Sequence, residues 1–160
     1  MPNFASKFAQ GTLGYVTGDC AGDVVVNDYF VDLTAGQIAL NNIIDLGILP
    51  ANHTVSDAIL IVGDLDTNGT PTIALDVGIM SGTPGDIISA RTCGNEFYAA
   101  DTTARAGGVA RMSKLAGFTI LPTEADRSIG VKIQAAAATA AAGRIRLRVF
   151  MHPADHMVQF

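Results

Sequence analysis

The chain has 160 residues, of which 49% are hydrophobic and 16% are charged, and this length predicts one domain with a full hydrophobic core. No apolar run reaches the about 20 residues that a membrane-spanning helix needs, so we exclude a membrane protein. A net charge of −5 and the absence of Trp argue against direct binding of nucleic acid. The low charge fits either an outer surface covered by partner subunits or a well-packed monomer.

The charges are unevenly distributed along the chain. The first 90 residues carry Lys7 alone against ten Asp, a net charge of −9, whereas the last 70 carry nine Lys or Arg against five Asp or Glu, a net charge of +4. Two interpretations follow. The halves promote association between copies through electrostatic complementarity, or strands from both halves interleave in one sandwich and the asymmetry disappears. We favour the second.

Residues 1–22 are rich in small and polar side chains without periodicity, which predicts a flexible N-terminal arm before a single domain over residues 23–160. Asp23–Leu33 has the β-branched and aromatic residues of a strand. The segment Gln37–Leu46 predicts a second strand that Gly47 ends. Its inward-facing positions are expected to be Ile38, Leu40, Ile44 and Leu46.

Two further strands are predicted over Val55–Val62 and Thr72–Met80. The first is apolar on both faces, which predicts a central strand covered on both sides. The second alternates cleanly, with Ile73, Leu75, Val77 and Ile79 on one face.

The remaining segments complete a count of about eight short strands separated by Gly, Pro and Asn. This spacing predicts an all-β fold, a jelly-roll-like β-sandwich. We expect strands over Ile87–Ala90, Glu96–Ala100, Gly117–Leu121, Ser128–Gln134 and Arg144–Met151, a long loop or short helix over Asp101–Leu115, and a small-residue link over Ala135–Ala142.

The turn between Val55–Val62 and Thr72–Met80 contains DLDTNG, which matches the opening positions of a calcium loop. Asp64 and Asp66 supply its first two acidic residues, but the twelfth position, which needs a bidentate Glu, is Leu75. The flanking segments are strands instead of helices. We therefore expect Asp, Asn and Gly to serve the backbone geometry of a turn, with a cation on Asp64 and Asp66 as the alternative, and no cofactor.

No catalytic set is found, and we expect no enzyme activity. The chain has no G-x-S-x-G motif and no phosphate-binding glycine loop. Cys20 and Cys93 form no C-x-x-C pair, and we expect reduced thiols. His152 and His156 have metal-ligand spacing only on a helix, and Pro153 predicts a loop there.

Three arginines, Arg144, Arg146 and Arg148, alternate along the last predicted strand and therefore lie on one face. We call them the arginine row. Three like charges in a line repel unless something acidic faces them. They either pair with Asp residues of neighbouring strands or form an interface with a partner, where Arg is favoured.

The order of segments resembles a known family. IIDLG (Ile43–Gly47) leads to a strand that enters GDLDTNGTPTIALDVG, and the chain closes with IGVKIQAAAATAAAGRIRLRVFMH. Over residues 35–152 this pattern resembles the jelly-roll capsid cement (decoration) proteins of tailed bacteriophages.

The resemblance implies a structural virion protein, assembled in the host cytoplasm, that binds the major capsid protein on the outer capsid surface as a homotrimer and stabilises the shell. It transfers no site residues. The alternatives are a tail or fibre-head virion module and a carbohydrate-binding β-sandwich, although the absence of Trp weakens the latter.

Overall fold

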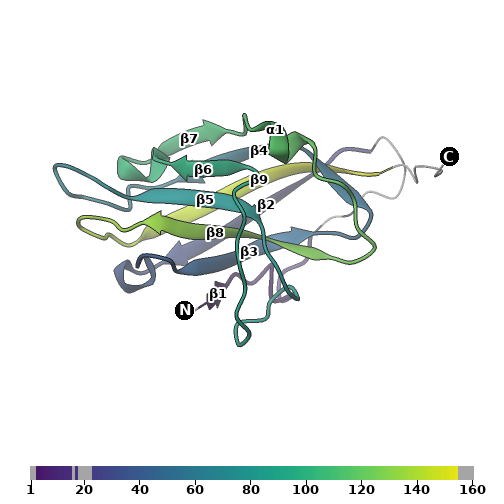
Figure 1. Ribbon diagram of the computed structural model, residues 1–160, viewed down its shortest axis with the longest axis horizontal. Helices are drawn as coiled ribbons and strands as arrows, with labels where there is room; N and C mark the ends of the chain where they lie inside the picture. Colours follow the sequence, from purple (N-terminus) through teal and green to yellow (C-terminus); the bar gives the residue numbers. More distant parts are fainter. Residues whose placement is uncertain (1–2, 16, 18–22, 155–160) are drawn as a thin grey trace.

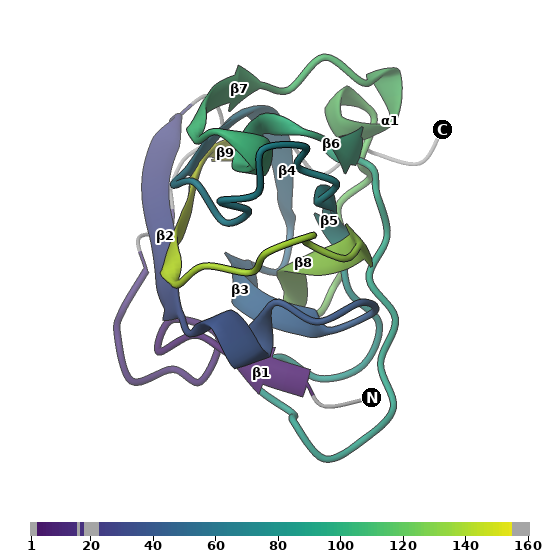
Figure 2. The ribbon, with the colours of Figure 1, turned by 90° about the vertical axis from the view of Figure 1, so that its left-hand side faces the viewer.

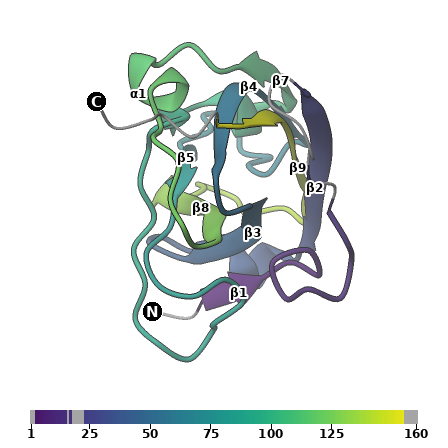
Figure 3. The same cartoon turned by 90° about the vertical axis from the view of Figure 1, so that its right-hand side faces the viewer.

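The structure is a computed structural model that describes residues 3–15, 17 and 23–154. Two sheets pack face to face around one core (Figures 1–3). Among the described residues no helix is long and apolar enough to cross a membrane. The strands are β1 (Asn3–Ala5), β2 (Val25–Leu33), β3 (Ile43–Leu49), β4 (His53–Val62), β5 (Ala74–Ile79), β6 (Tyr98–Asp101), β7 (Gly108–Arg111), β8 (Arg127–Ala135) and β9 (Gly143–Pro153), and the helices are η1 (Ala35–Gln37), η2 (Thr103–Arg105) and α1 (Leu115–Phe118).

The strand order is that of a jelly roll with one added strand. One sheet has the order β1-β3-β8-β5-β6 and the other β2-β9-β4-β7. Every pairing is antiparallel except that of β1 with β3. Without β1, eight strands form two four-stranded sheets, as in the double-sheet jelly roll. The predicted all-β, jelly-roll-like sandwich is confirmed.

The core lies between the sheets and consists of the inward-facing side chains of both. Along β9, Ile145, Leu147, Val149 and Met151 are fully buried, which confirms the alternation predicted there. Tyr29 on β2 crosses the core, and its hydroxyl donates to the carbonyl of Ile48 at 2.6 Å. The buried phenol is therefore satisfied, as a core polar group must be.

The prediction that Gly47 ends a strand is wrong, because β3 continues through it to Leu49. A β-bulge lies between Asp45 and Gly47. A Cβ atom at residue 47 would overlap the ring of Tyr29. Glycine stands there to admit an aromatic ring, so its role is packing. Leu40, expected to face inward, is exposed in the turn before β3.

Four other segments differ from expectation. Gly117–Leu121 is not a strand: its first residues complete α1, where Gly117 lies against Met112. Ile87–Ala90 is irregular, and β6 begins at Tyr98. The segment Asp101–Leu115, expected as a long loop or short helix, contains the short helix η2 and also β7, an edge strand whose mostly exposed residues show no alternation. The 135–142 link connects β8 to β9, as predicted, and it contains no helical turn.

The N-terminal segment is packed where it is described. β1 pairs in parallel with β3, and the buried Ser6 donates its hydroxyl hydrogen to the carbonyl of Leu46. The Phe8 ring makes edge contacts with the rings of Tyr29 and Phe30, with centroids 5.3 and 5.4 Å apart. A loosely held arm is therefore not observed over residues 3–13, while residues 16 and 18–22 lie outside the described chain.

Candidate assembly surfaces

The arginine row lies on the outer face of the four-stranded sheet, opposite an acidic row on β2. The register pairs Asp28 with Arg148, Phe30 with Arg146 and Asp32 with Arg144. Arg144 binds Asp32 through two hydrogen bonds of 2.7 and 2.8 Å. Arg148 and Arg146 share Asp28, at 3.2 and 3.6 Å. The expected cross-strand pairing is observed.

Phe30 lies between the two acidic residues and beneath two of the arginines. The guanidinium carbons of Arg144 and Arg146 lie 4.8 and 5.7 Å from the centre of its ring, within the range of cation–π attraction. Hydrogen bonding to Arg144 lowers the pKa of Asp32 and holds the pKa of Arg144 above its usual value. Two aspartates thus compensate most of the charge of the three arginines within the chain, and the role of the row as an interface stays a prediction.

The pairing of early acidic residues with late basic residues extends beyond the arginine row. All five ion pairs among the described residues join an Asp of the first 90 residues to an Arg of the last 70. The interleaving of the acidic and basic halves is confirmed, because β9 lies between β2 and β4 in one sheet and β8 lies between β3 and β5 in the other.

Asp66 of the DLDTNG turn is buried, with 1% of its surface exposed, and binds backbone amides. Its carboxylate accepts N–H groups from Thr139 (2.8 Å), Ala138 (2.9 Å), Thr72 (2.7 Å) and Ile73 (3.2 Å). Burial by itself raises the pKa of Asp66, but these four donors outweigh it and hold the pKa far below its usual value.

Asp64 has a different part in the turn, since its carboxylate accepts the Asp66 amide at 3.0 Å. Asn68 similarly accepts the amide of Thr70 at 2.9 Å. Both are side-chain turns of the kind that Asp and Asn favour. The 135–142 link is fastened to the β4–β5 turn by Asp66 and by Asn68, whose side-chain amide donates to the Thr139 hydroxyl at 3.0 Å.

The other sequence candidates are dispersed. Burial raises the pKa of the Cys93 thiol to about 12, so its thiolate is scarce at neutral pH. Cys20 and His156 lie outside the described residues. His152 lies in β9, since the strand extends through Pro153, and not in the predicted loop. Within the described chain, no three His, Cys, Asp or Glu side chains gather as a metal site.

A buried ion pair that the sequence did not reveal lies on the outer face of the five-stranded sheet. Arg91 binds Asp45 of β3, and each side chain is 1% exposed. Asp45 also accepts the Ser128 hydroxyl of β8 and the Gly85 amide, both at 2.9 Å. No motif marks this pair, because its members are 46 residues apart and only the tertiary fold brings them together.

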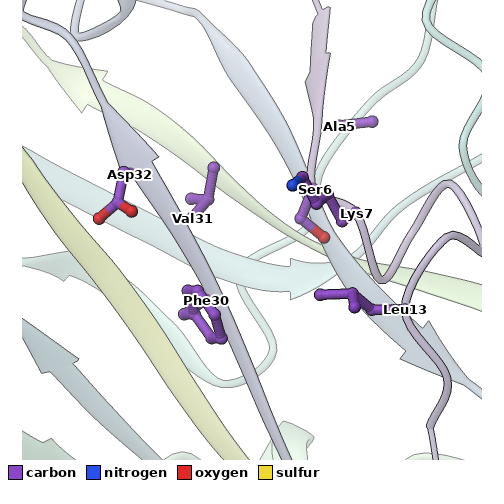
Figure 4. A pocket seen from close by; sticks show the side chains of 7 residues that line it. All are labelled: Ala5, Ser6, Lys7, Leu13, Phe30, Val31 and Asp32. Carbon is purple, nitrogen blue, oxygen red and sulfur yellow. The ribbon is translucent and has the colours of Figure 1, made fainter.

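A pocket of about 330 Å³ separates the N-terminal segment from β2. Figure 4 shows Ser6, Lys7 and Leu13 facing Phe30, Val31 and Asp32 across it. The lining is mainly apolar, with one charge of each sign. This composition resembles that of a shallow contact surface more than that of a catalytic cleft, which requires convergent polar groups.

Exposed apolar side chains occur in several separate places. One group surrounds α1 (Leu115, Phe118 and Leu121), and a second lies at the start of β2 (Val24 and Val26). A third is formed by Ile87 and Ile88, in the loop that connects β5 to β6. Each group is a candidate contact surface, because clustered exposed apolar side chains mark interaction sites.

Three solved structures contain similar chains. A chain in the capsid of Ralstonia phage GP4 is 47% identical, with a TM-score of 0.92 over 96% of this chain and 99% of that chain. One in the Cyanophage Pam1 capsid asymmetric unit is 29% identical, with a TM-score of 0.66 over 87% and 91%.

A chain from the acidic stable capsid of Helicobacter pylori bacteriophage KHP30 is 14% identical, with a TM-score of 0.53 over 84% of this chain and 92% of that chain, and shares the fold. The sequence matches no protein-family model and no curated protein.

Proposed function

Since this chain belongs to the family of bacteriophage capsid proteins found in the Ralstonia phage GP4 capsid, and is thus a structural component of a virion, we propose that it is a cement (decoration) protein. It binds the outer surface of a shell built by the major capsid protein and stabilises that shell without catalysis. It acts as a homotrimer assembled in the host cytoplasm. The tail or fibre-head module and the sugar-binding sandwich gain no support from the three capsid neighbours.

The observation that carries this proposal is the self-contained packing of the sandwich. A protein that is added to an existing shell must be folded and soluble before it binds. Here the described N-terminal segment folds back onto β3 of its own chain, and the buried Ser6 donates its hydroxyl hydrogen to the carbonyl of Leu46. This packing fits a subunit that folds on its own before it joins a shell.

The separate apolar patches support association of two kinds. The α1 group (Leu115, Phe118 and Leu121) and the β2 group (Val24 and Val26) are independent exposed surfaces. A trimer needs one surface between its copies and another toward the shell. Three linked attachments would then hold each trimer far more tightly than one.

Two measurements test the proposal. The mass of the purified protein in solution should be three times 16.6 kDa. Shells of the major capsid protein alone should bind it to saturation and gain resistance to heat. Shells that fail to form when this protein is omitted, or closed shells built by this protein alone, would instead show that it is the major capsid protein.

A further inference from the structure

The connection between β5 and β6 presents two adjacent isoleucines at the edge of the molecule. Residues 81–92, which we call the 81–92 loop, extend past β3 and β1 as the teal segment at the bottom of Figure 1. Ile88 is 95% exposed and Ile87 is 49% exposed. The described chain leaves Ile88 almost uncovered and covers about half of Ile87, and a side chain as exposed as Ile88 contributes little to the core.

Arg91 holds the loop in one shape. Its guanidinium donates to the carbonyls of Ser81 (2.6 Å) and Asp86 (3.1 Å) within the loop, and to the Ser128 hydroxyl (2.7 Å) and Asp45 carboxylate of the sheet beneath. One buried side chain thus fastens the outgoing arm of the loop to the returning arm and both to β3 and β8. Such preorganisation lowers the entropy lost on binding.

The tip of the loop, residues 85–90, is also held in place by hydrogen bonds and packing. The Asp86 carboxylate accepts the amides of Ile88 and Ser89 at 2.8 and 3.1 Å. Gly85 has a φ of 78°, and a Cβ there would lie 2.7 Å from the carbonyl oxygen of Ala9. The tip therefore rests on the N-terminal segment, and its two isoleucines point from a rigid base.

The chemistry of the tip defines its partner. Arg91 is buried and the Asp86 carboxylate is bonded within the loop, so the tip presents β-branched apolar side chains flanked by Ser89 and Ala90. It fits an apolar pocket of a protein. Polyanions and sugars would need charged or hydrogen-bonding groups.

The size of the tip identifies which protein. Two side chains bury far less than the about 800 Å² per partner of a stable standard interface, so the tip cannot by itself hold copies of this chain together. It is adequate for a contact that each trimer makes three times on a lattice. We infer that the 81–92 loop anchors this protein to the shell by inserting Ile87 and Ile88 into an apolar pocket of the major capsid protein. The inference rests on the proposed function.

The test compares the double variant Ile87→Ser/Ile88→Ser with the wild type in binding to shells of the major capsid protein alone. Binding should weaken at least a hundred-fold, because three anchors are lost per trimer. The matched control is Val109→Ser on β7, which is 67% exposed near the opposite edge in Figure 1, and its binding should stay within three-fold. Ile88→Val, which keeps a β-branched apolar side chain, should retain binding within about ten-fold.

The outcomes separate this inference from the proposed function. If the wild type does not bind shells, the cement role fails. If the wild type binds and the double variant binds equally well, only the anchor is wrong. If the double variant loses its trimeric mass in solution, the tip is a contact between copies, and the anchor is again overturned.

Discussion

The outer faces of the two sheets use the same chemical pair in opposite ways. On the four-stranded sheet, Asp32 and Arg144 pair in solvent, with side chains 67% and 48% exposed. On the five-stranded sheet, Asp45 and Arg91 pair with each side chain 1% exposed, under the 81–92 loop. Exposed pairs keep most of their hydration and contribute little to stability, whereas a buried pair is costly to break. The first face keeps its charges at the surface, and the second uses one charge pair to fix a loop.

Among the variants that test this difference between the buried and the exposed ion pair, Arg91→Met should have the largest effect on stability. The change leaves the Asp45 carboxylate buried without its partner, so the free energy of unfolding should fall by about 3–5 kcal/mol. Urea denaturation of the purified protein measures it. The double variant Arg91→Met/Asp45→Leu, which buries no unpaired charge, should recover part of the loss. A loss below about 1 kcal/mol in Arg91→Met would place this pair with the exposed ones.

Asp66→Asn tests whether backbone amides alone, without an arginine partner, stabilise a buried carboxylate. The amide replaces one acceptor oxygen with a donor that faces backbone N–H groups, so the Tm should fall by about 5 °C or more at pH 7.

The pH dependence of Asp66 has a definite sign. Because the folded pKa of Asp66 is depressed, its contribution is complete above its unfolded pKa of about 3.9 and is lost as the pH falls below it. The Tm difference between wild type and Asp66→Asn should therefore narrow below about pH 4. Thermal melts at pH 7, 4 and 3 measure this, and a constant difference would contradict it.

Gly78→Ala tests how closely the backbone at Gly94 and Asn95, just after the 81–92 loop, covers the five-stranded sheet. Gly78 faces Gly130 across β5 and β8, and a Cβ there would lie 2.7 and 2.8 Å from backbone atoms of Gly94 and Asn95. Overpacking against backbone should cost about 1–3 kcal/mol in urea denaturation. Gly63→Ala is the control, because its nearest atoms lie at 3.8 Å or more, and equal losses in both variants would refute close packing.

The smallest effect is expected for Arg144→Gln on the exposed face. Its ion pair with Asp32 is solvated, so the Tm should change by less than about 2 °C. That difference should shrink further in 1 M salt, where the Debye length is about 3 Å. A large fall in the Tm that salt does not reduce would show that the exposed arginine row stabilises the fold as much as the buried pair does.

The sequence predicted those parts of the fold that periodicity governs. Arg144–Met151 alternates because one face meets the core and the other meets water, and both β9 and its arginine row were found where expected. For β3 the sequence suggested an alternation over Gln37–Leu46 that the strand does not show, since all seven of its residues are buried. Gly47 was interpreted as a strand end because glycine often ends strands. Its actual role is to make room for the ring of Tyr29, which is 18 residues away in the sequence and therefore gives no local signal.

The same distinction between local and long-range signals applies to the candidate surfaces. The pairing of the arginine row with Asp residues was foreseen because charge alternation is local. The 81–92 loop was not foreseen as a feature, because its order depends on contacts of Arg91 with Asp45 and Ser128. Patterns among residues close in sequence, such as alternating charges, can be predicted, whereas contacts between residues distant in sequence cannot.

The alternation of the two chain halves has a consequence for synthesis. β9 lies between β2 and β4, and β8 lies between β3 and β5, so each sheet receives a central strand after its flanking strands have left the ribosome. The sheets cannot close during translation of the first 126 residues, and folding is dominated by distant contacts, which makes it slow. The acidic early strands then attract the basic late ones, and their charge pattern guides the last strand into the gap left for it.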